Sequence, residues 1–507
     1  MSQGVLGFQY GTESRRSGMT ALAGLPLYLD LAEAASMSRS IERHLKIRDG
    51  KQGWTDQQMV MSLILLNVAG GDCVEDLRVL ESDEGFARVL RRVEGQRLPR
   101  RERRQQERRW RRERRRAVPS PSAAFRYLSA FHDAEEEKLR VAGTAWIPRP
   151  NESLRGLAQV QQDFLGFVQS RRPEAVATLD MDATLIETSK QEALYCYQHY
   201  PAYQPLNVWW AEQGLVAYTE FRDGNVPAGY EQLRVLRETL ERLPAGVETV
   251  RLRSDSAGYQ HELLSYCAKG EHPRFGKIDF AVSADVTVEF RQAVSAVAES
   301  AWQPLWRQVG ERRFETGQQW AEVCFVPNAI GHSKKGPEYR YLAIREPLRQ
   351  RALPGLESQR ALPFSPVEMG GESYKVSGVV TTLNWSGEAV ITWLRERCGK
   401  SEEAHAVMKE DLAGGKLPSG DFGENAAWWW IMVLAFNLNA AMKRLVLGQG
   451  WVSKRMKAVR FGLIHLPARV VEHARQLWVR LGVGHPALEL FLAARRRILA
   501  LAQGPAG

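Results

Sequence analysis

The feature that most constrains the fold is an alternation of short apolar segments and one-sided helices in residues 174–299. Short apolar runs rich in β-branched residues and bounded by turn residues predict strands. They occur at residues 175–186, 206–210, 214–221, 249–254 and 277–283. Apolar residues at helical spacing predict helices, at residues 230–242, 258–269 and 287–299. The order indicates a mixed α/β fold in which three antiparallel strands begin the sheet and helical crossovers add the later ones.

The charge of the chain is concentrated in one run of arginines. Lys and Arg outnumber Asp and Glu by 69 to 59, which gives a net charge of +10 and a pI near 9.4. Residues 97–116 hold twelve arginines and three glutamates, so they carry nine of these ten charges. Such a run cannot bury itself, so we expect a solvated helix or a disordered arm. A basic balance favours a nucleic-acid partner, whereas a low-complexity insertion without a specific role is the simpler alternative.

Cysteine usage and hydropathy argue against export and against a membrane protein. The five cysteines are scattered, without the close pair that builds a zinc site or a redox motif. No N-terminal segment has the pattern of a signal peptide. The most apolar stretch, residues 426–433, is soon followed by Asn437 and Asn439, well short of the ~20 residues that span a bilayer. We therefore expect a cytoplasmic chain in which this stretch is a buried helix.

The candidate metal-binding residues are carboxylates at the ends of two expected strands. Asp180 and Asp182 lie in TLDMDATLIET and share one strand face with Thr184, because side chains alternate along a strand. Two such carboxylates are costly on an apolar strand unless a cation compensates them or the strand is an exposed edge. Asp255 ends the expected strand 249–254 in RLRSDSAG, where it could equally be a helix cap. Converging carboxylates hold the two cations, ~4 Å apart, that phosphodiester cleavage uses.

Several segments together resemble a known family. The motifs are LDMDATLIE, YCYQHYPAYQPLNVWW, AYTEFRDGNVPAG, LRSDSAGY and ERCGKSEEAHAVMKEDLAGGKLP. In combination they are similar to the DDE transposases of bacterial insertion sequences, and most similar to the insertion sequence 1380 family. The likeness runs from about residue 20 to about residue 480. It implies an α/β fold with a ribonuclease H-like catalytic core and an inserted mostly β region, flanked by N- and C-terminal helical parts.

The resemblance also implies roles for individual residues. Asp182, Asp255 and Glu402 would be the catalytic acids and the ligands of two Mg²⁺ or Mn²⁺ ions. Asp180 and Thr184 are accessory candidates. No other cofactor is implied.

The helix that carries the last acid matches the family pattern only in part. In related transposases a Tyr and an Arg precede this acid and a Lys follows seven positions later. Lys409 stands seven residues after Glu402, two α-helical turns on, so we expect both on one face, where Lys409 would hold a DNA phosphate. Arg397, the candidate upstream Arg, stands five residues before Glu402 instead of four, and Leu394 replaces the Tyr. Glu396 and Glu403 are the alternative third acids, and a solvated helix face is the alternative for the whole segment.

The arginine run lies outside the family pattern and adds a second set of DNA-binding candidates. Its central members are Arg108, Arg109, Arg111 and Arg112. A basic arm binds phosphates without reading sequence, because each neutralised phosphate releases counterions.

These expectations divide the chain into seven parts. They are an N-terminal helical DNA-binding region, an Arg-rich arm, a helical connector, the first part of the core, the inserted β region, the completion of the core with the Glu-bearing helix, and a C-terminal helical region. The corresponding residues are 1–96, 97–121, 122–173, 174–299, 300–386, 387–445 and 446–507.

The function expected from the resemblance is cut-and-paste DNA transposition. The enzyme would bind terminal inverted repeats, free a 3′-hydroxyl and join it to target double-stranded DNA, as a homodimer associated with the bacterial nucleoid and not with a membrane. The alternatives are a catalytically inactive DNA-binding descendant and a nuclease without strand transfer. The presence of all three candidate acids argues against the inactive descendant, because a decayed copy tolerates their loss.

Overall fold

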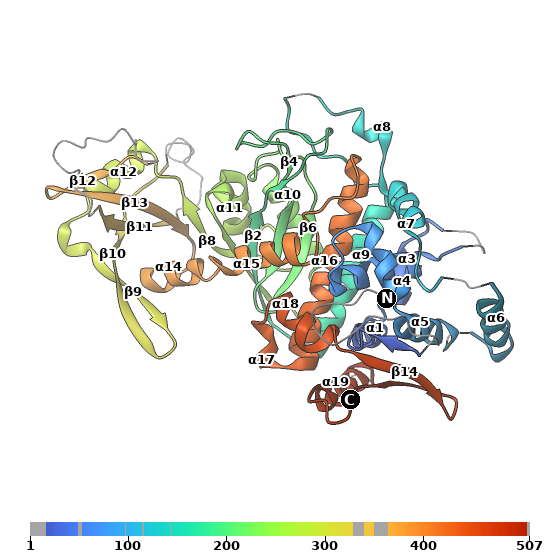
Figure 1. Ribbon diagram of the computed structural model, residues 1–507. Coiled ribbons are helices and arrows are strands. Elements are labelled where there is room, and N and C mark those ends of the chain that lie inside the picture. Colours follow the sequence, from blue (N-terminus) through green and yellow to red (C-terminus); the bar gives the residue numbers. More distant parts are fainter. Residues whose placement is uncertain are drawn as a thin grey trace, which may run out of the picture. The chain divides into compact units, whose positions relative to one another are not determined.

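The computed structural model describes residues 17–48, 53–96, 98–113, 116–141, 143–327, 339–348 and 364–503. The chain forms two compact units, each assembled from segments that are distant in sequence (Figure 1). The helical unit comprises Met1–Pro173, Ile186–Tyr203 and His405–Gly507. The sheet unit comprises Glu174–Leu185 and Gln204–Ala404.

One mixed ten-stranded sheet, counted over the described residues, organises the sheet unit. Its order is β6-β5-β2-β7-β8-β13-β11-β10-β9, with β12 paired to β13. The first strands are β2 (Val176–Ala183), β5 (Leu206–Trp210), β6 (Leu215–Glu220), β7 (Thr249–Ser254) and β8 (Asp279–Ala284). Strands β2, β5 and β6 pair antiparallel, whereas β2, β7 and β8 pair parallel. The expected mixed α/β class, with three antiparallel strands before the crossovers, is confirmed.

Helical crossovers supply the parallel strands, because a tight turn cannot join two parallel neighbours. They are α10 (Gln232–Arg242) and α11 (His261–Lys269), and α12 (Val288–Ser295) follows β8. Helix α11 begins three residues later than expected because Ser256–Gly258 forms a 3₁₀ turn that Asp255 caps. Thr287 caps α12 by accepting a hydrogen bond from the Phe290 N–H at 3.2 Å.

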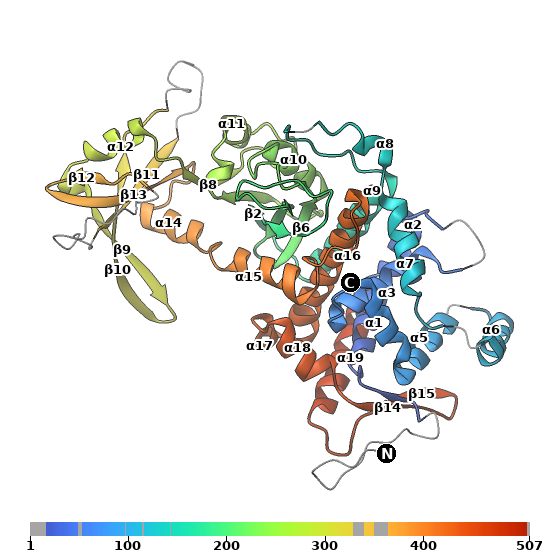
Figure 2. The ribbon, with the colours of Figure 1, turned by 45° about the horizontal axis from the view of Figure 1, so that its top comes forward.

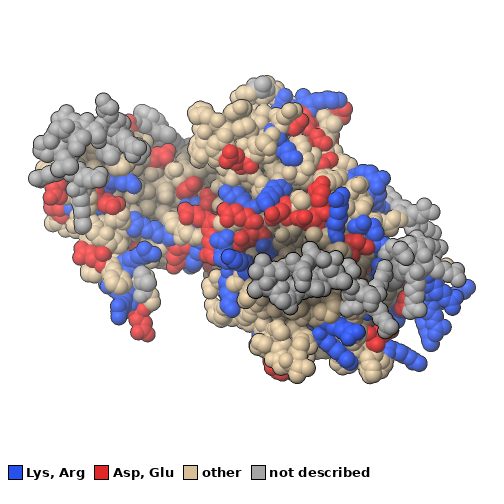
Figure 3. Space-filling view, viewed as in Figure 1, with Lys and Arg blue, Asp and Glu red and all other residues tan. Residues whose placement is uncertain are grey.

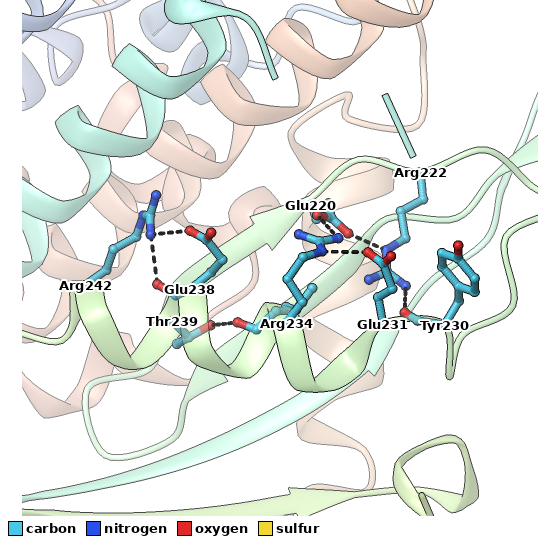
Figure 4. Close-up of polar contacts among 9 residues, drawn as sticks. Glu220, Arg222, Tyr230, Glu231, Arg234, Glu238, Thr239 and Arg242 are labelled. Atoms are coloured by element: carbon cyan, nitrogen blue, oxygen red, sulfur yellow. Dashed lines mark hydrogen bonds and ion pairs between the residues drawn. The ribbon is translucent and has the colours of Figure 1, made fainter. Parts of the chain in front are cut away.

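Buried charge anchors α10 to β6 (Figure 4). The fully buried Arg222 donates from Nε to Glu220 and from Nη1 to the Tyr230 carbonyl, each at 2.8 Å. Arg234 of α10 forms ion pairs with Glu220 and Glu231, each at 2.6 Å. Because both arginines bind the last residue of β6, the start of the helix is held at the end of the strand.

The strands between residues 300 and 386 extend the same sheet. They are β9 (Gln303–Val309), β10 (Arg312–Val323), β11 (Arg340–Pro347), β12 (Val367–Met369) and β13 (Glu372–Thr381). β13 pairs antiparallel with β8, Gly378 lying opposite Ala284. Helix α14 (Gly387–Arg395) contributes Val390, Ile391 and Leu394 to one apolar cluster with residues of these strands. The expected β region is therefore continuous with the core sheet.

The helical unit is built around one buried helix, α16 (Phe422–Ala441), which packs against α3 and α9 (Figure 2). Trp428 and Trp429 are fully buried, and the Trp428 indole N–H donates to the Ala413 carbonyl at 2.9 Å. The buried helix expected at residues 426–433 is confirmed. Among the described residues, Phe422–Leu447 is also the one helix apolar and long enough to cross a membrane, but 78% of its apolar window is buried inside the protein.

The unit contains twelve further α-helices among the described residues. They are α1 (Leu25–Ala34), α2 (Met37–His44), α3 (Asp56–Ala69), α4 (Leu77–Ser82), α5 (Glu84–Gln96), α6 (Arg100–Glu113), α7 (Pro121–Leu128), α8 (Ala134–Glu137), α9 (Glu152–Arg171), α17 (Gln449–Val452), α18 (Met456–Val459) and α19 (Ala487–Gln503). The short strands β3 (Ile186–Glu187) and β4 (Ala202–Tyr203) pair with each other.

The C-terminal region differs from the helical region expected there. It contains a hairpin of β14 (Ala468–His473) and β15 (Gln476–Arg480), and β14 also pairs with β1 (Met19–Thr20). The two turn residues, Ala474 and Arg475, both have positive φ, at 50° and 65°. Such turns usually carry Asn or Gly, so the sequence lacked the signal that would have predicted this hairpin.

Glu94 provides a pH-dependent element of stability. Its carboxylate accepts a hydrogen bond at 2.8 Å from Gln58, which also completes the capping box of α3. Burial raises the pKa of Glu94 to about 7, whereas the hydrogen bond from Gln58 lowers it. Because the folded pKa exceeds the unfolded one, the associated stability is present at acid pH and is lost as the pH rises through about 7.

We therefore expect Glu94→Gln to raise the free energy of unfolding by about 1–3 kcal/mol at pH 8.5 and to change it little at pH 4.5. Urea unfolding at the two pH values measures this difference. Gln in place of the exposed Glu135 is the control and should change neither value. An equal effect of Glu94→Gln at both pH values would show that its ionisation does not oppose folding.

Candidate active site

Two aspartates are brought together by the parallel pairing of β2 with β7. The register pairs Asp180 with Arg253 and Met181 with Ser254. The next residues are Asp182, still within β2, and Asp255, directly after β7. Parallel strands end at the same edge of a sheet, so both carboxylates are carried at this edge. The Asp255 carboxylate accepts from the Ala257 N–H at 3.1 Å, which fixes the turn that follows.

Asp180 is occupied by a buried ion pair. Arg253 binds it through two hydrogen bonds, Nε to Oδ1 at 2.5 Å and Nη2 to Oδ2 at 2.8 Å. Their side chains are 1% and 2% exposed. Burial raises the pKa of Asp180, and the hydrogen bonds and charge of Arg253 lower it. Asp180 and Asp182 share a strand face as expected, but Asp180 is engaged in holding two strands together.

The same arginine also holds the end of α14. Its Nη1 donates to the Trp393 carbonyl at 2.7 Å and to Glu396 at 3.2 Å. The guanidinium also lies 5.0 Å from the centre of the Trp393 ring. Since residues 396–399 lead from α14 to α15 (Lys400–Ala406), Arg253 positions the chain that carries Glu402. Sequence reasoning missed Arg253, which is one of two arginines that alternate with apolar residues in the strand TVRLRS.

Arg397 lies against Asp182. The distance from its Nη2 to Oδ2 of Asp182 is 3.4 Å, and its side chain is 10% exposed. Its buried Nε–H has no hydrogen-bond partner among the described residues. Burial raises the pKa of Asp182 to about 6, and the charge of Arg397 opposes this rise.

The neighbouring carboxylates raise the pKa of Asp182 as well, in the order Asp255, Asp180 and Glu402. Glu402 is exposed on α15, which lies beside β2 in both ribbon views (Figures 1 and 2). The structure thus brings the charges of the three expected acids into one neighbourhood. Glu396, one of the alternatives, is bound to Arg253, and the other, Glu403, is exposed.

Lys409 does not follow the regular helix that we expected. Val407–Asp411 is a π-helical turn, in which the Leu412 N–H donates to the Val407 carbonyl at 2.9 Å. The expected shared face assumed 3.6 residues per turn, which a π-helical turn exceeds because its hydrogen bonds span five residues. Lys409 also belongs to the helical unit, whereas Glu402 belongs to the sheet unit. The regular α-helical spacing assumed between Glu402 and Lys409 is therefore not present, and the role of Lys409 stays a prediction.

Two polar residues flank the end of β2. Thr184 is buried, and its N–H donates to the Pro205 carbonyl at 3.0 Å. Asn207, which we did not single out, stands opposite Asp182 on β5 and accepts a 2.7 Å hydrogen bond from the Thr219 hydroxyl. Its signal was a lone amide in the apolar strand LNVWW.

The arginine run is helical over α6. Basic side chains are visible around this helix at the right of Figure 3. Arg108 is exposed. The side chains of Arg109, Arg111 and Arg112 lie outside the described residues.

The donor set of this site is made of carboxylate oxygens, which suit a hard divalent cation. In the described part of the chain, no three His, Cys, Asp or Glu side chains converge closely enough to hold a metal ion. Beside burial, repulsion from the neighbouring carboxylates raises the pKa of Asp182. A cation bound between these carboxylates would relieve this repulsion. The residues therefore fit an oxygen-preferring divalent cation, provided that Glu402 approaches the aspartate pair.

Comparison with known proteins shows the family of the chain. The chain belongs to the family described as Transposase DDE domain group 1, which it matches over residues 13–353 and 357–503. The protein is thus a member of a transposase family, a metal-dependent class of enzymes. No curated protein matches it. Among solved structures it is similar to a piggyBac transposase in a synaptic complex with hairpin DNA, at 9% identity and a TM-score of 0.39, covering 96% of this chain and 83% of that one.

The buried ion pair makes a prediction about stability. Arg253→Met leaves the Asp180 carboxylate buried without its partner, and breaking such a pair costs about 3–5 kcal/mol. We expect Arg253→Met to lower the free energy of unfolding by that amount, and Asp180→Leu combined with Arg253→Met to recover most of it. Urea unfolding provides the measurement.

Arg251→Met is the matched control on the same strand. Arg251 stacks on the Trp385 ring, with its guanidinium 5.1 Å from the ring centre, and such a contact contributes about 0.5–1 kcal/mol. A double variant as unstable as Arg253→Met alone would show that the lost charge pair is not the cause.

Proposed function

We propose that this protein is a DNA transposase that binds the terminal inverted repeats of an insertion sequence and catalyses metal-dependent DNA cleavage and strand transfer. The observation that carries the proposal is the strand register that makes Asp182 and Asp255 neighbours at one sheet edge, in a chain that belongs to a transposase family. The sheet order supports a ribonuclease H-like core. Double-stranded DNA is the substrate and the partner.

The proposed catalytic residues are Asp182, Asp255 and Glu402, with two Mg²⁺ or Mn²⁺ ions as cofactors. The ions would activate the attacking oxygen and stabilise the leaving oxygen of the scissile phosphodiester. Arg253 keeps Asp180 paired, so that Asp182 is the carboxylate of β2 available at the edge. Glu402 is preferred as the third acid because Glu396 already binds Arg253 and because the charge of Glu402 raises the pKa of Asp182.

Basic residues have a separate role. The Arg397 guanidinium forms an ion pair with Asp182. We propose that it contacts a phosphate of the bound DNA, as does Lys409. Arg108, Arg109, Arg111 and Arg112 would bind phosphates without reading sequence. Thr184 is proposed to support the end of β2.

The finer classification rests on the sequence motifs. We propose that the protein belongs to the insertion sequence 1380 family of bacteria and acts in association with the nucleoid. Since transposition joins two element ends, we also propose that it works as a homodimer in the synaptic complex.

The proposed acids can be tested one at a time. We expect Asp182→Asn, Asp255→Asn and Glu402→Gln to bind terminal DNA normally, because each change keeps the size of the side chain. Each should lower Mn²⁺-dependent cleavage by more than about 100-fold, since even the partners of metal ligands cost ~10- to 100-fold when they are changed. Gel separation of end-labelled terminal DNA measures cleavage.

Glu403→Gln is the matched control for Glu402→Gln, because Glu403 is the exposed neighbour on the same helix. It should cleave normally. If Glu403→Gln were inactive and Glu402→Gln active, the proposed third acid would be wrong by one residue. Normal cleavage by Asp182→Asn or Asp255→Asn would remove that aspartate from the site.

Strand transfer separates a transposase from a nuclease. With pre-cleaved terminal DNA and a supercoiled target, we expect joined products that depend on the 3′-hydroxyl. A terminal DNA that ends in a 3′-deoxy nucleotide is the control and should give none. Cleavage without any joining would favour a nuclease.

The arginine run should govern the salt dependence of binding. Each phosphate contact adds about 0.9 to the slope of log affinity against log salt. Deletion of residues 97–116 should therefore flatten this slope by several units for DNA of any sequence. Substituting lysines for these arginines keeps the charge and should leave the slope almost unchanged. If the slope of log affinity against log salt were the same with and without residues 97–116, the arginine run would not bind DNA.

A further inference from the structure

Strands β9 and β10 form a two-stranded ribbon at the edge of the ten-stranded sheet. They pair antiparallel from Arg312 opposite Val309 to Glu315 opposite Trp306, and the register shifts before Gln319. In both ribbon views this hairpin runs on beyond the other strands of its sheet (Figures 1 and 2). The β10 residues from 312 to 317 are all exposed. A two-stranded hairpin without further packing is only marginally stable in water. Because the outer part of this hairpin has no third strand beside it among the described residues, we consider it as a candidate binding element.

The pairing divides the ribbon into two faces. Residues opposite each other on paired strands share a face, and neighbours along a strand alternate. Phe314 lies opposite Arg307, so these two share one face with Arg312. Trp306 and Arg313 lie on the other face, together with Glu315.

The face of Trp306 and Arg313 is already in use. The Arg313 guanidinium lies 5.0 Å from the centre of the Trp306 ring. Arg313 also forms an ion pair with Glu388 of α14 at 2.7 Å. This face is therefore satisfied within the sheet unit.

The opposite face, which we call the basic ribbon face, consists of Arg307, Arg312 and Phe314. Both arginines are exposed, and neither forms an ion pair with any described residue. Phe314 is 50% exposed. Figure 3 shows basic and acidic side chains on this hairpin.

We propose that the basic ribbon face binds duplex DNA in the major groove. A two-stranded ribbon fits this groove, which is about 12 Å wide. Two arginines without acidic partners complement phosphates on the groove walls, and an aromatic ring between them suits contact with sugars or base edges. The inference rests on the proposed function and adds to it the surface that holds the DNA away from the acids.

The test compares two faces of one hairpin. Binding of a 30-base-pair fluorescent duplex is followed by anisotropy between 50 and 300 mM salt, with Ca²⁺ present so that DNA is not cut. We expect Arg307→Gln combined with Arg312→Gln to reduce the slope of log affinity against log salt by about 2, because two phosphate contacts are lost. Lys at both positions should keep the slope. Phe314→Ala should weaken binding about fivefold at constant slope, the low end of the range for an aromatic contact with a base.

Arg313→Gln is the matched control, because it removes the same charge from the opposite face. An unchanged slope in the Arg307/Arg312 double variant would overturn the proposal and leave a protein partner for this face. An effect of Arg313→Gln half as large as that of the double variant would also overturn it, because the two faces would then act alike. If the unaltered protein bound no DNA, both this inference and the proposed function would fail. If it bound and cut DNA while the double variant behaved normally, only the ribbon inference would fail.

Discussion

The arrangement of the acids depends on one buried ion pair, that of Asp180 with Arg253. It joins β2 to β7 just before the two half-buried aspartates, so it supports the register that makes Asp182 and Asp255 neighbours. The remaining guanidinium N–H groups bind the Trp393 carbonyl and Glu396. A single arginine thus relates the three segments that carry the proposed acids. Because such a pair is expensive to bury, every donor and acceptor must be matched for it to persist.

The site gathers like charges at some cost in stability. Burial and neighbouring carboxylates raise the pKa of Asp182, and the charge of Arg397 opposes this rise. The two aspartates are carried at the ends of paired strands, whereas Glu402 is carried on the short helix α15.

Much of the fold could be predicted from the sequence, because the strands of the core are short apolar runs with clear turn residues. The strands at residues 206–210 and 249–254 were predicted with their observed bounds. Long-range pairing could not be predicted. No local sequence pattern indicated that β13 would pair with β8 or that Arg253 would bind Asp180. The π-helical turn at Lys409 was not predicted, because such a turn depends on packing and not on residue spacing. The site residues remain proposals, supported by register and electrostatics.

The central claim is that the segments of Asp182, Asp255 and Glu402 together form the site of the divalent cations. Iron-mediated cleavage of the protein tests this most directly, because Fe²⁺ in place of Mg²⁺ generates hydroxyl radicals that cut the polypeptide beside the bound ion. With ascorbate and peroxide, the account predicts cuts in three segments, at residues 180–184, 253–257 and 400–404, and their loss when excess Mg²⁺ is added. Cuts confined to other segments, or cuts at the two aspartates without the third segment, would contradict it.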